Sequence, residues 1–186
     1  MAELGRIVKL QIQTDLLARD HYDPAPLYET ERLLLTPSGA LAWCDGGWTV
    51  DSHHRDFPGR RYWNQDRALS VGFTSHYEAM AAHFGRAPLG CAGENVTIEA
   101  DHQISPEELL NGLVIEADGR RVELGGLRIA QPCVPFTEFM LGAPTDNAQV
   151  EVHRDFLRGG MRGFVTGLDH LSEPTEIREG DRVSTR

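Results

Sequence analysis

A cysteine between two prolines is one place where this chain could do chemistry. Cys133 lies in the stretch Ile129–Phe136, where a predicted strand ends and Pro132 and Pro135 restrict the backbone to a tight, extended segment. A thiol held at a strand end can face a pocket as a nucleophile, a persulfide carrier or a ligand for a soft metal. The alternative is a small buried hydrophobic side chain, because free cysteines are often buried.

Two adjacent histidines follow Asp51 in the segment from Asp45 to Asp66, which is rich in Gly, Asp, His and Arg and is predicted to be a long loop. Neighbouring side chains on an extended chain point to opposite sides, so His53 and His54 are not expected to bind one ion together. The alternatives are a histidine that forms hydrogen bonds in a substrate pocket and a solvated histidine.

The motif Gly93-Glu94-Asn95-Val96-Thr97 stands at a predicted loop-to-strand junction. Gly93 allows the backbone to approach a ligand closely. Asn95 offers both a donor and an acceptor to a heterocycle, whereas an ionised Glu94 only accepts. The alternative is a turn that its own Asn and Thr side chains satisfy.

Three arginines gather near the end of a predicted helix over residues 147–158. Arg154 and Arg158 are four residues apart and share a helix face, and Arg162 follows just beyond it. Three guanidinium groups in one place could hold a phosphate. The alternative is a set of surface ion pairs with the acidic residues of the same helix.

The composition limits the classes of partner. The 186 residues carry a formal net charge of −10, which argues against a nucleic-acid or anionic-membrane surface. The three cysteines have no CxxC spacing, and the beginning of the chain lacks the features of a signal peptide. No apolar run is long enough to span a membrane. We expect one cytoplasmic domain over residues 1–186, with no nucleic-acid or membrane partner.

The elements that must position these residues are mainly short strands. The predicted strands are Ile7–Ile12, Arg32–Leu35, Ala68–Phe73, Asn95–Ala100, Leu113–Ala117, Arg121–Leu124, Leu127–Gln131, Gly163–Leu168 and Asp181–Ser184. Asp118-Gly119 and Gly125-Gly126 are predicted to form tight hairpin turns. Many short strands with few helices predict a mainly β (α+β) fold, a barrel or sandwich whose ends the helices cover.

Two further helices are predicted from capping signals. Ser75 is expected to cap a helix that Gly85 ends, with Glu78 completing a capping box. A short helix is expected from Ser105 to Gly112, with Glu108 in a second capping box.

The order of these motifs resembles the MOSC domain, a module at the C-terminus of molybdenum cofactor sulfurases that also occurs as standalone bacterial proteins. The resemblance covers roughly residues 5 to 184. The matching pieces are Asp51-Ser52-His53, Gly59, Arg67-Ala68-Leu69-Ser70, the Ser75 helix, Gly93-Glu94-Asn95-Val96-Thr97, Gln131-Pro132-Cys133, Gly159-Gly160-Met161-Arg162-Gly163 and Gly180-Asp181-Arg182-Val183. The Gly-Glu-Asn-Val-Thr and Gly-Asp-Arg-Val pieces are the most specific.

The resemblance implies a MOSC-like β-barrel with a few short helices and a cleft for a pterin-type molybdenum cofactor (molybdopterin) or for carrier-bound sulfur. The implied catalytic residues are Cys133, His53 and Glu94, and Cys133 is also the implied metal contact. The implied cofactor-binding residues are Asp51, Arg67, Asn95, Thr97, Gln131, Arg158 and Arg162. The implied partners are a small-molecule cofactor or sulfur-containing substrate, and a sulfur donor or a molybdoenzyme.

The sequence departs from the family pattern at the reactive cysteine. Relatives carry it at the end of a Gln-Pro-x-x-Pro-Cys-like stretch, where this chain has Phe136. Either Cys133 has taken the role, or the thiol chemistry is lost and Phe136 shapes a pocket for a different substrate. We expect no pyridoxal phosphate, because a Schiff base needs a lysine and Lys9, on the first predicted strand, is the only one.

Three functions remain open from the sequence. The first is sulfur transfer or reductive chemistry at a pterin-bound molybdenum, with Cys133 as the thiolate. The second is cleavage of a carbon–sulfur bond without molybdenum, in a pocket of His53, Glu94 and Arg162. The third is a non-catalytic module that delivers a cofactor to a partner.

Overall fold

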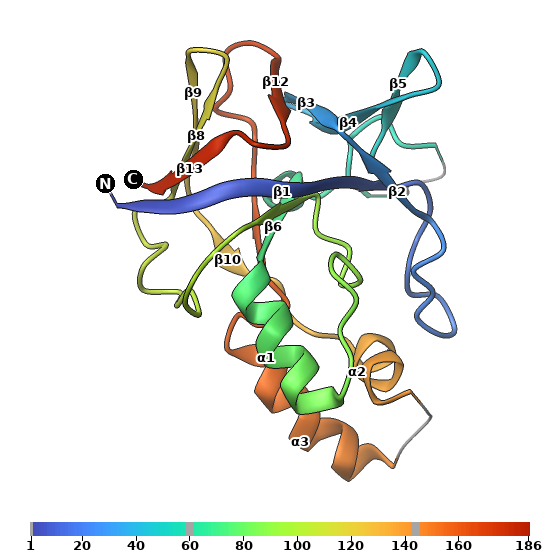
Figure 1. Cartoon of the computed structure of the whole chain (residues 1–186). Coiled ribbons are helices and arrows are strands. Elements are labelled where there is room, and N and C mark those ends of the chain that lie inside the picture. Colours follow the sequence, from blue (N-terminus) through green and yellow to red (C-terminus); the bar gives the residue numbers. More distant parts are fainter. Residues whose placement is uncertain (1, 59–61, 143–145) are drawn as a thin grey trace.

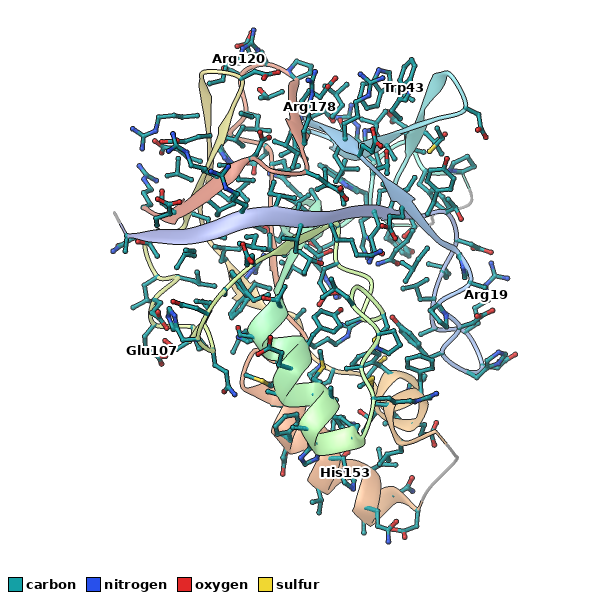
Figure 2. All side chains as sticks on the ribbon, viewed as in Figure 1. Arg19, Trp43, Glu107, Arg120, His153 and Arg178 are labelled. Carbon is teal, nitrogen blue, oxygen red and sulfur yellow. The ribbon has the colours of Figure 1, made fainter. Side chains whose placement is uncertain are left out.

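The computed structural model describes residues 2–58, 62–142 and 146–186, and in these ranges the protein is mostly β-sheet. A curled, barrel-like sheet and a smaller second sheet form one part of the molecule, and three helices gather at the other end (Figure 1). Charged side chains such as Arg120 and Arg178 lie on the outside of the sheets (Figure 2). The predicted mainly β fold with a few short helices is confirmed.

The helices and strands have the following bounds. The strands are β1 (Glu3–Gln13), β2 (Leu27–Thr30), β3 (Arg32–Thr36), β4 (Gly39–Cys44), β5 (Gly47–Val50), β6 (Leu69–Phe73), β7 (Val96–Ile98), β8 (Leu113–Ala117), β9 (Arg120–Leu124), β10 (Arg128–Ile129), β11 (Phe164–Thr166), β12 (Thr175–Arg178) and β13 (Arg182–Thr185). The helices are α1 (Thr74–Phe84), α2 (Val134–Leu141) and α3 (Asn147–Arg158), with a 3₁₀ turn, η1 (Gln65–Arg67).

The long strand β1 connects the parts of the larger sheet, whose order is β10-β11-β6-β7-β1-β13-β8-β9. The first part of β1 pairs with β13, and the second part pairs with β7 and β2. The strands β6 and β7 are parallel, and the chain crosses between them through α1. The crossover brings the start of β6 beside the start of β7. The smaller sheet has the order β12-β3-β4-β5.

Two apolar clusters form the core. The larger one joins the sheets, and Phe73, Phe164 and Leu10 are among its fully buried members. The second lies among the helices and includes Tyr77 of α1 and Phe136 of α2. Alternating residues of a strand face opposite sides, so a strand such as β1 can supply one cluster while its other face carries polar groups.

The predicted helix from Ser105 to Gly112 is wrong, because this stretch forms turns. The reciprocal capping hydrogen bonds do form, since the amide of Ser105 donates to Glu108 and the amide of Glu108 donates to the Ser105 hydroxyl. Gly112, at a φ of 95°, then stops the segment.

Two other predictions of local geometry need correction. The helix α1 begins at Thr74 with Phe73 as the N-cap, so Ser75 does not cap it and its buried hydroxyl has no hydrogen-bond partner. The turn at Asp118-Gly119 is a two-residue hairpin, as predicted. Gly125-Gly126 is not a hairpin turn, because β9 pairs with β8 while β10 pairs with β11.

The strands β2, β4 and β12 were not predicted from the sequence. Further differences concern the two segments that carry the predicted chemistry. The predicted long loop from Asp45 to Asp66 contains β5, and Gly59 lies outside the described residues. Cys133 itself is extended, but α2 starts at the next residue with Pro135 in its first turn, where proline is tolerated. The predicted strand Leu127–Gln131 shortens to Arg128–Ile129.

Candidate functional site

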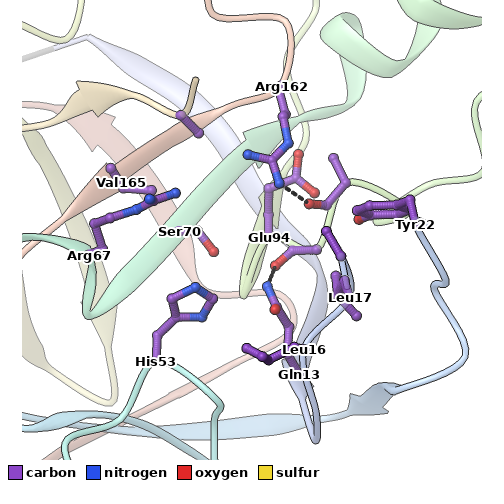
Figure 3. Close-up of a pocket in the computed structure, with 14 residues that line it drawn as sticks. Gln13, Leu16, Leu17, Tyr22, His53, Arg67, Ser70, Glu94, Arg162 and Val165 are labelled. Atoms are coloured by element: carbon purple, nitrogen blue, oxygen red, sulfur yellow. Dashed lines mark hydrogen bonds between the residues drawn. The ribbon is translucent and has the colours of Figure 1, made fainter. Parts of the chain in front are cut away.

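A cavity of about 180 Å³ opens where the ends of β1, β6 and β11 meet the loop after β1 and the loop before β7 (Figure 3). It is smaller than the roughly 300–1,000 Å³ usual for drug-sized ligands, so it suits a small molecule or one group of a larger molecule. Four predicted site residues line it: His53, Arg67, Glu94 and Arg162. The other lining residues are Gln13, Leu16, Leu17, Ala18, Tyr22, Ser70, Ala92, Gly93, Ala130 and Val165.

Asp51 lies behind the cavity wall and is completely buried. Its Oδ2 accepts hydrogen bonds from the Gln13 amide at 2.8 Å and from Asn95 Nδ2 at 3.0 Å. Its Oδ1 accepts from the His53 amide at 2.7 Å and lies 3.1 Å from His53 Nδ1. Burial opposes ionisation of Asp51, but the hydrogen bonds from His53 and Gln13 hold its pKa below the ordinary value.

His53 is half-buried and reaches the cavity from the segment that follows β5. Its backbone carbonyl accepts a hydrogen bond from Trp63 Nε1 at 3.1 Å, which fixes the segment. A carboxylate beside Nδ1 favours a proton on that nitrogen and leaves Nε2 as the basic atom. His54 is buried and lies next to Thr36, so the two histidines do not share a site. The structure therefore provides one oriented imidazole at the cavity.

Asn95 was predicted to bind a cofactor, but it is buried and does not line the cavity. Its Oδ1 accepts hydrogen bonds from the amide and hydroxyl of Ser70, and Ser70 does line the cavity. Asn95 thus connects the start of β6 to Asp51.

Glu94 is a buried carboxyl at the cavity, and the Tyr77 hydroxyl donates to its Oε2 at 2.6 Å. Its Oε1 is buried and has no hydrogen-bond partner. Burial raises the pKa of Glu94, against the hydrogen bond from Tyr77 and the charge of Arg162. Gly72 makes space for it, because a Cβ there would lie 2.7 Å from Oε1.

Arg162 supplies positive charge on the same side as Glu94. Its guanidinium donates to the carbonyls of Gln131 at 3.2 Å and Ala92 at 3.4 Å, and it stacks on the Phe136 ring at 5.2 Å. Its Nε is buried without a hydrogen-bond partner. Figure 3 shows the Arg67 side chain across the cavity from Arg162. The lining is locally cationic on a chain whose net charge is −10, so a small anion fits it.

The thiol chemistry predicted for Cys133 is not supported by its place in the structure. Cys133 is the N-cap of α2 and packs against the helical cluster with Tyr22, but it does not line the cavity. Cys91 belongs to the loop before β7 and is buried, and burial raises the pKa of its thiol to about 12. Phe136, at the position of the family cysteine, is completely buried in that cluster.

Three other predicted cofactor-binding residues also lie away from the cavity lining. Gln131 is exposed and contributes only its backbone carbonyl to Arg162. Thr97 is buried on β7, and its hydroxyl has no hydrogen-bond partner. Arg158 pairs with Glu151 and Asp155 on the surface of α3. The ion-pair interpretation of Arg158 therefore holds.

The sequence-based prediction missed the contribution of β1 and the loop after it. Gln13 Nε2 donates to the Gly93 carbonyl at 2.9 Å, and Gln11 Nε2 donates to the Gly90 carbonyl at 2.7 Å. Tyr22, from the loop, donates to the Cys91 carbonyl at 2.6 Å. A signal was present, because polar residues at positions 9, 11 and 13 place one polar face on a buried strand.

The described residues contain no group of three His, Cys, Asp or Glu side chains placed to hold a metal ion. None of the helices in the described ranges is both long and apolar enough to cross a membrane. Lys9, the only lysine, forms an ion pair with Glu29, and its side chain is largely buried.

Comparisons with known proteins agree with this architecture. The family model of the MOSC domain matches residues 52–184. The crystal structure of the YuaD protein from Bacillus subtilis is similar, with a TM-score of 0.59 at 16% identity over 98% of this chain and 94% of that one. YiiM from Escherichia coli has a TM-score of 0.51 at 14% identity, over 97% of this chain and 70% of that one. No curated protein gave a significant sequence match.

Proposed function

The chain belongs to the MOSC domain family, and from this premise we propose that it is an enzyme that acts on a small anionic molecule by acid–base chemistry, without a protein thiol. The observation that carries the proposal is the composition of the cavity lining. An oriented imidazole, a buried carboxyl and two guanidinium groups line it, and no cysteine does. Cys133 packs against the helical cluster, of which Tyr22 is a member.

Each lining group has a role that its surroundings support. Arg67 and Arg162 bind the anionic group of the ligand, because a guanidinium offers paired donors to a carboxylate or phosphate. His53 is the base, because Asp51 fixes its Nδ1 and leaves Nε2 for the ligand. Glu94 is the acid, because burial raises its pKa and keeps a proton on it at higher pH than on an exposed carboxyl.

The reaction class that we propose is cleavage of a carbon–sulfur bond by elimination. His53 Nε2 takes a proton from carbon, and the electron pair of that carbon–hydrogen bond forms a carbon–carbon double bond. The carbon–sulfur bond breaks and its electron pair leaves with the sulfur, which takes a proton from Glu94. Atoms and electrons balance without an oxidant, a reductant or a metal, and solvent restores both side chains.

The molybdenum cofactor that the family implies fits this chain only in part. The two arginines suit the phosphate of a molybdopterin. A thiolate ligand for the metal does not fit, because Cys133 does not line the cavity and Cys91 stays protonated behind it. We therefore derive no step through molybdenum. Metal analysis of protein from a host that makes the cofactor checks this: stoichiometric molybdenum that is lost in Cys133→Ser would contradict us.

The test of the proposed function is a binding titration with inorganic phosphate at low ionic strength. Arg162→Gln is expected to weaken binding about tenfold, which is about 1.4 kcal/mol. Arg154→Gln is the matched control, because Arg154 also has a buried, unpartnered Nε but lies on α3 in an ion pair with Glu151. Cys133→Ser should bind phosphate as the unchanged protein does. Loss of binding in Cys133→Ser, or equal losses in the two arginine variants, would refute the proposal.

A further inference from the structure

Asn95 has a hydrogen-bond environment that admits one orientation of its amide. The Ser70 amide can only donate, and it points to Asn95 Oδ1 at 3.0 Å. The Gln11 carbonyl can only accept, and it lies 3.2 Å from Asn95 Nδ2. The two groups come from the neighbouring strands β6 and β1, on either side of β7. The oxygen and nitrogen of Asn95 are thus assigned by backbone chemistry.

This orientation determines what Asp51 receives. The second contact of Asn95 Nδ2 is Asp51 Oδ2 at 3.0 Å, so a donor faces this carboxylate oxygen. With the amides of Gln13 and His53, backbone and side chain supply three donors before the imidazole is counted. A carboxylate surrounded by donors is ionised and has no proton to give. The atom of Asp51 that remains for the imidazole is therefore an acceptor.

The acceptor then fixes the histidine. Asp51 Oδ1 lies 3.1 Å from His53 Nδ1. Ser52 Oγ is 3.3 Å from the same nitrogen, but its hydroxyl can donate to Gln13 Oε1, so the carboxylate keeps the proton of a neutral His53 on Nδ1. Nε2 is then unprotonated in the neutral imidazole. The order of contacts runs from Ser70 through Asn95 and Asp51 to His53, and its two ends line the cavity while its middle members are buried.

We infer that Asn95 is a positioning residue for His53, which acts through Asp51 and does not touch the ligand. The inference rests on the proposed role of His53 as a base. It changes the role predicted for the Gly-Glu-Asn-Val-Thr motif: Glu94 lines the cavity, whereas the next residue orients a side chain on the opposite wall. Replacing the donor of Asn95 by an acceptor should therefore change the tautomer of the His53 imidazole.

The test is the tautomer of His53, measured from the ¹⁵N shifts of its two ring nitrogens at a pH where the ring is neutral. In the unchanged protein we expect the Nδ1-protonated form to predominate. Asn95→Asp keeps the shape but turns an acceptor toward Asp51, so a proton must be shared between the two carboxyls. This proton weakens Asp51 as an acceptor, and the Nε2-protonated fraction should rise severalfold.

The control is Thr97→Val, which alters a buried residue two positions further along the chain, on β7, whose hydroxyl has no hydrogen-bond partner. It should leave the His53 tautomer unchanged. A folded Asn95→Asp with the tautomer of the unchanged protein would overturn the inference. So would a predominantly Nε2-protonated His53 in the unchanged protein.

A measurement without substitution covers the case in which Asn95→Asp does not fold. The side-chain amide protons of Asn95 should shift as Asp51 is protonated in an acid titration, with a midpoint below the ordinary pKa of aspartate. Absence of that shift would refute the contact. Phosphate binding reports on the proposed function alone, so failure there with the tautomer result intact would remove the function and leave the positioning role.

Discussion

The two sides of the cavity satisfy their polar groups in opposite ways. On the side of Asp51 and His53, every oxygen of the buried carboxylate has donors within 3.1 Å. On the side of Glu94 and Arg162, two buried atoms, Glu94 Oε1 and Arg162 Nε, have no hydrogen-bond partner. The first side is fully hydrogen-bonded within the protein, whereas the second keeps two buried polar atoms without partners.

This difference separates stability from function within one site. A fully hydrogen-bonded buried network fixes geometry and contributes to folding. A buried polar atom without a partner costs free energy, so its retention points to a role in binding or chemistry. We therefore expect removal of the Asp51 carboxylate to destabilise the protein, and removal of the charge of Glu94 to be tolerated or to stabilise it. The following predictions test this contrast.

Asp51→Ala should have the largest effect on stability. It leaves the donors of Gln13 and Asn95 buried without an acceptor, and we expect a loss of about 3–5 kcal/mol in the free energy of unfolding. Urea denaturation measures it, with the exposed Asp56→Ala as control.

The pH dependence of stability in the unchanged protein and in Asp51→Ala makes this prediction more specific. The folded pKa of Asp51 is lowered, so its contribution is present above the unfolded pKa and is lost as pH falls through the folded value. The difference between the unchanged protein and Asp51→Ala should shrink in acid. A difference that stays constant down to the folded pKa would contradict the hydrogen-bond account.

Gly72→Ala should cost about 1–3 kcal/mol, because the new Cβ meets Glu94 Oε1 at 2.7 Å. Gly125→Ala is the matched control, since a Cβ there meets nothing within 4 Å. Thermal unfolding of the double variant Gly72→Ala/Glu94→Ala should recover part of the loss. If Gly72→Ala destabilises the protein equally with and without Glu94, contact with Glu94 is not the reason for a glycine at this position.

Glu94→Gln should stabilise the protein by about 1 kcal/mol at alkaline pH, because it removes a buried carboxylate. The folded pKa is raised from its ordinary 4.5, so the contribution of Glu94 is present below the unfolded pKa and is lost as pH rises through the folded value. The gain in Glu94→Gln should therefore grow with pH. Unfolding measured at several pH values checks this, and a gain that grows toward acid would contradict it.

Cys133→Ser should have the smallest effect, within about 0.5 kcal/mol, because the residue is only partly buried. In the unchanged protein, iodoacetamide should modify Cys133 well before Cys91, whose pKa is raised to about 12. Peptide mass spectrometry gives the order of modification. Faster modification of Cys91 would show that the helical cluster opens readily.

The sequence allowed the fold class and much of the site to be predicted, for identifiable reasons. Short alternating strands indicated a mainly β fold, and the motif order brought His53, Glu94 and Arg162 to one place. The role of Asn95 could not be predicted from the residue type, because its side-chain amide can form hydrogen bonds with a ligand or with a buried carboxylate. The parallel pairing of β6 and β7, which puts Ser70 beside it, decides between them.

The role of Cys133 could also not be determined from the local sequence. Flanking prolines predicted an extended segment that presents a thiol, and the residue is extended. Pro135 also fits the first turn of a helix, and α2 turns the following residues into the core. Whether Pro135 continues an extended segment or starts a helix depends on the apolar partners of Phe136. Those partners come from a distant segment that includes Tyr22.

The most direct test of the central claim is a titration of ¹⁵N-labelled protein with inorganic phosphate, followed at the arginine Nε–H and histidine ring resonances. We predict saturable shifts at Arg162, Arg67 and His53 with one common affinity, and none at Arg158. Shifts centred on Arg158, or spread over the surface arginines without saturation, would contradict a single anion-binding cavity.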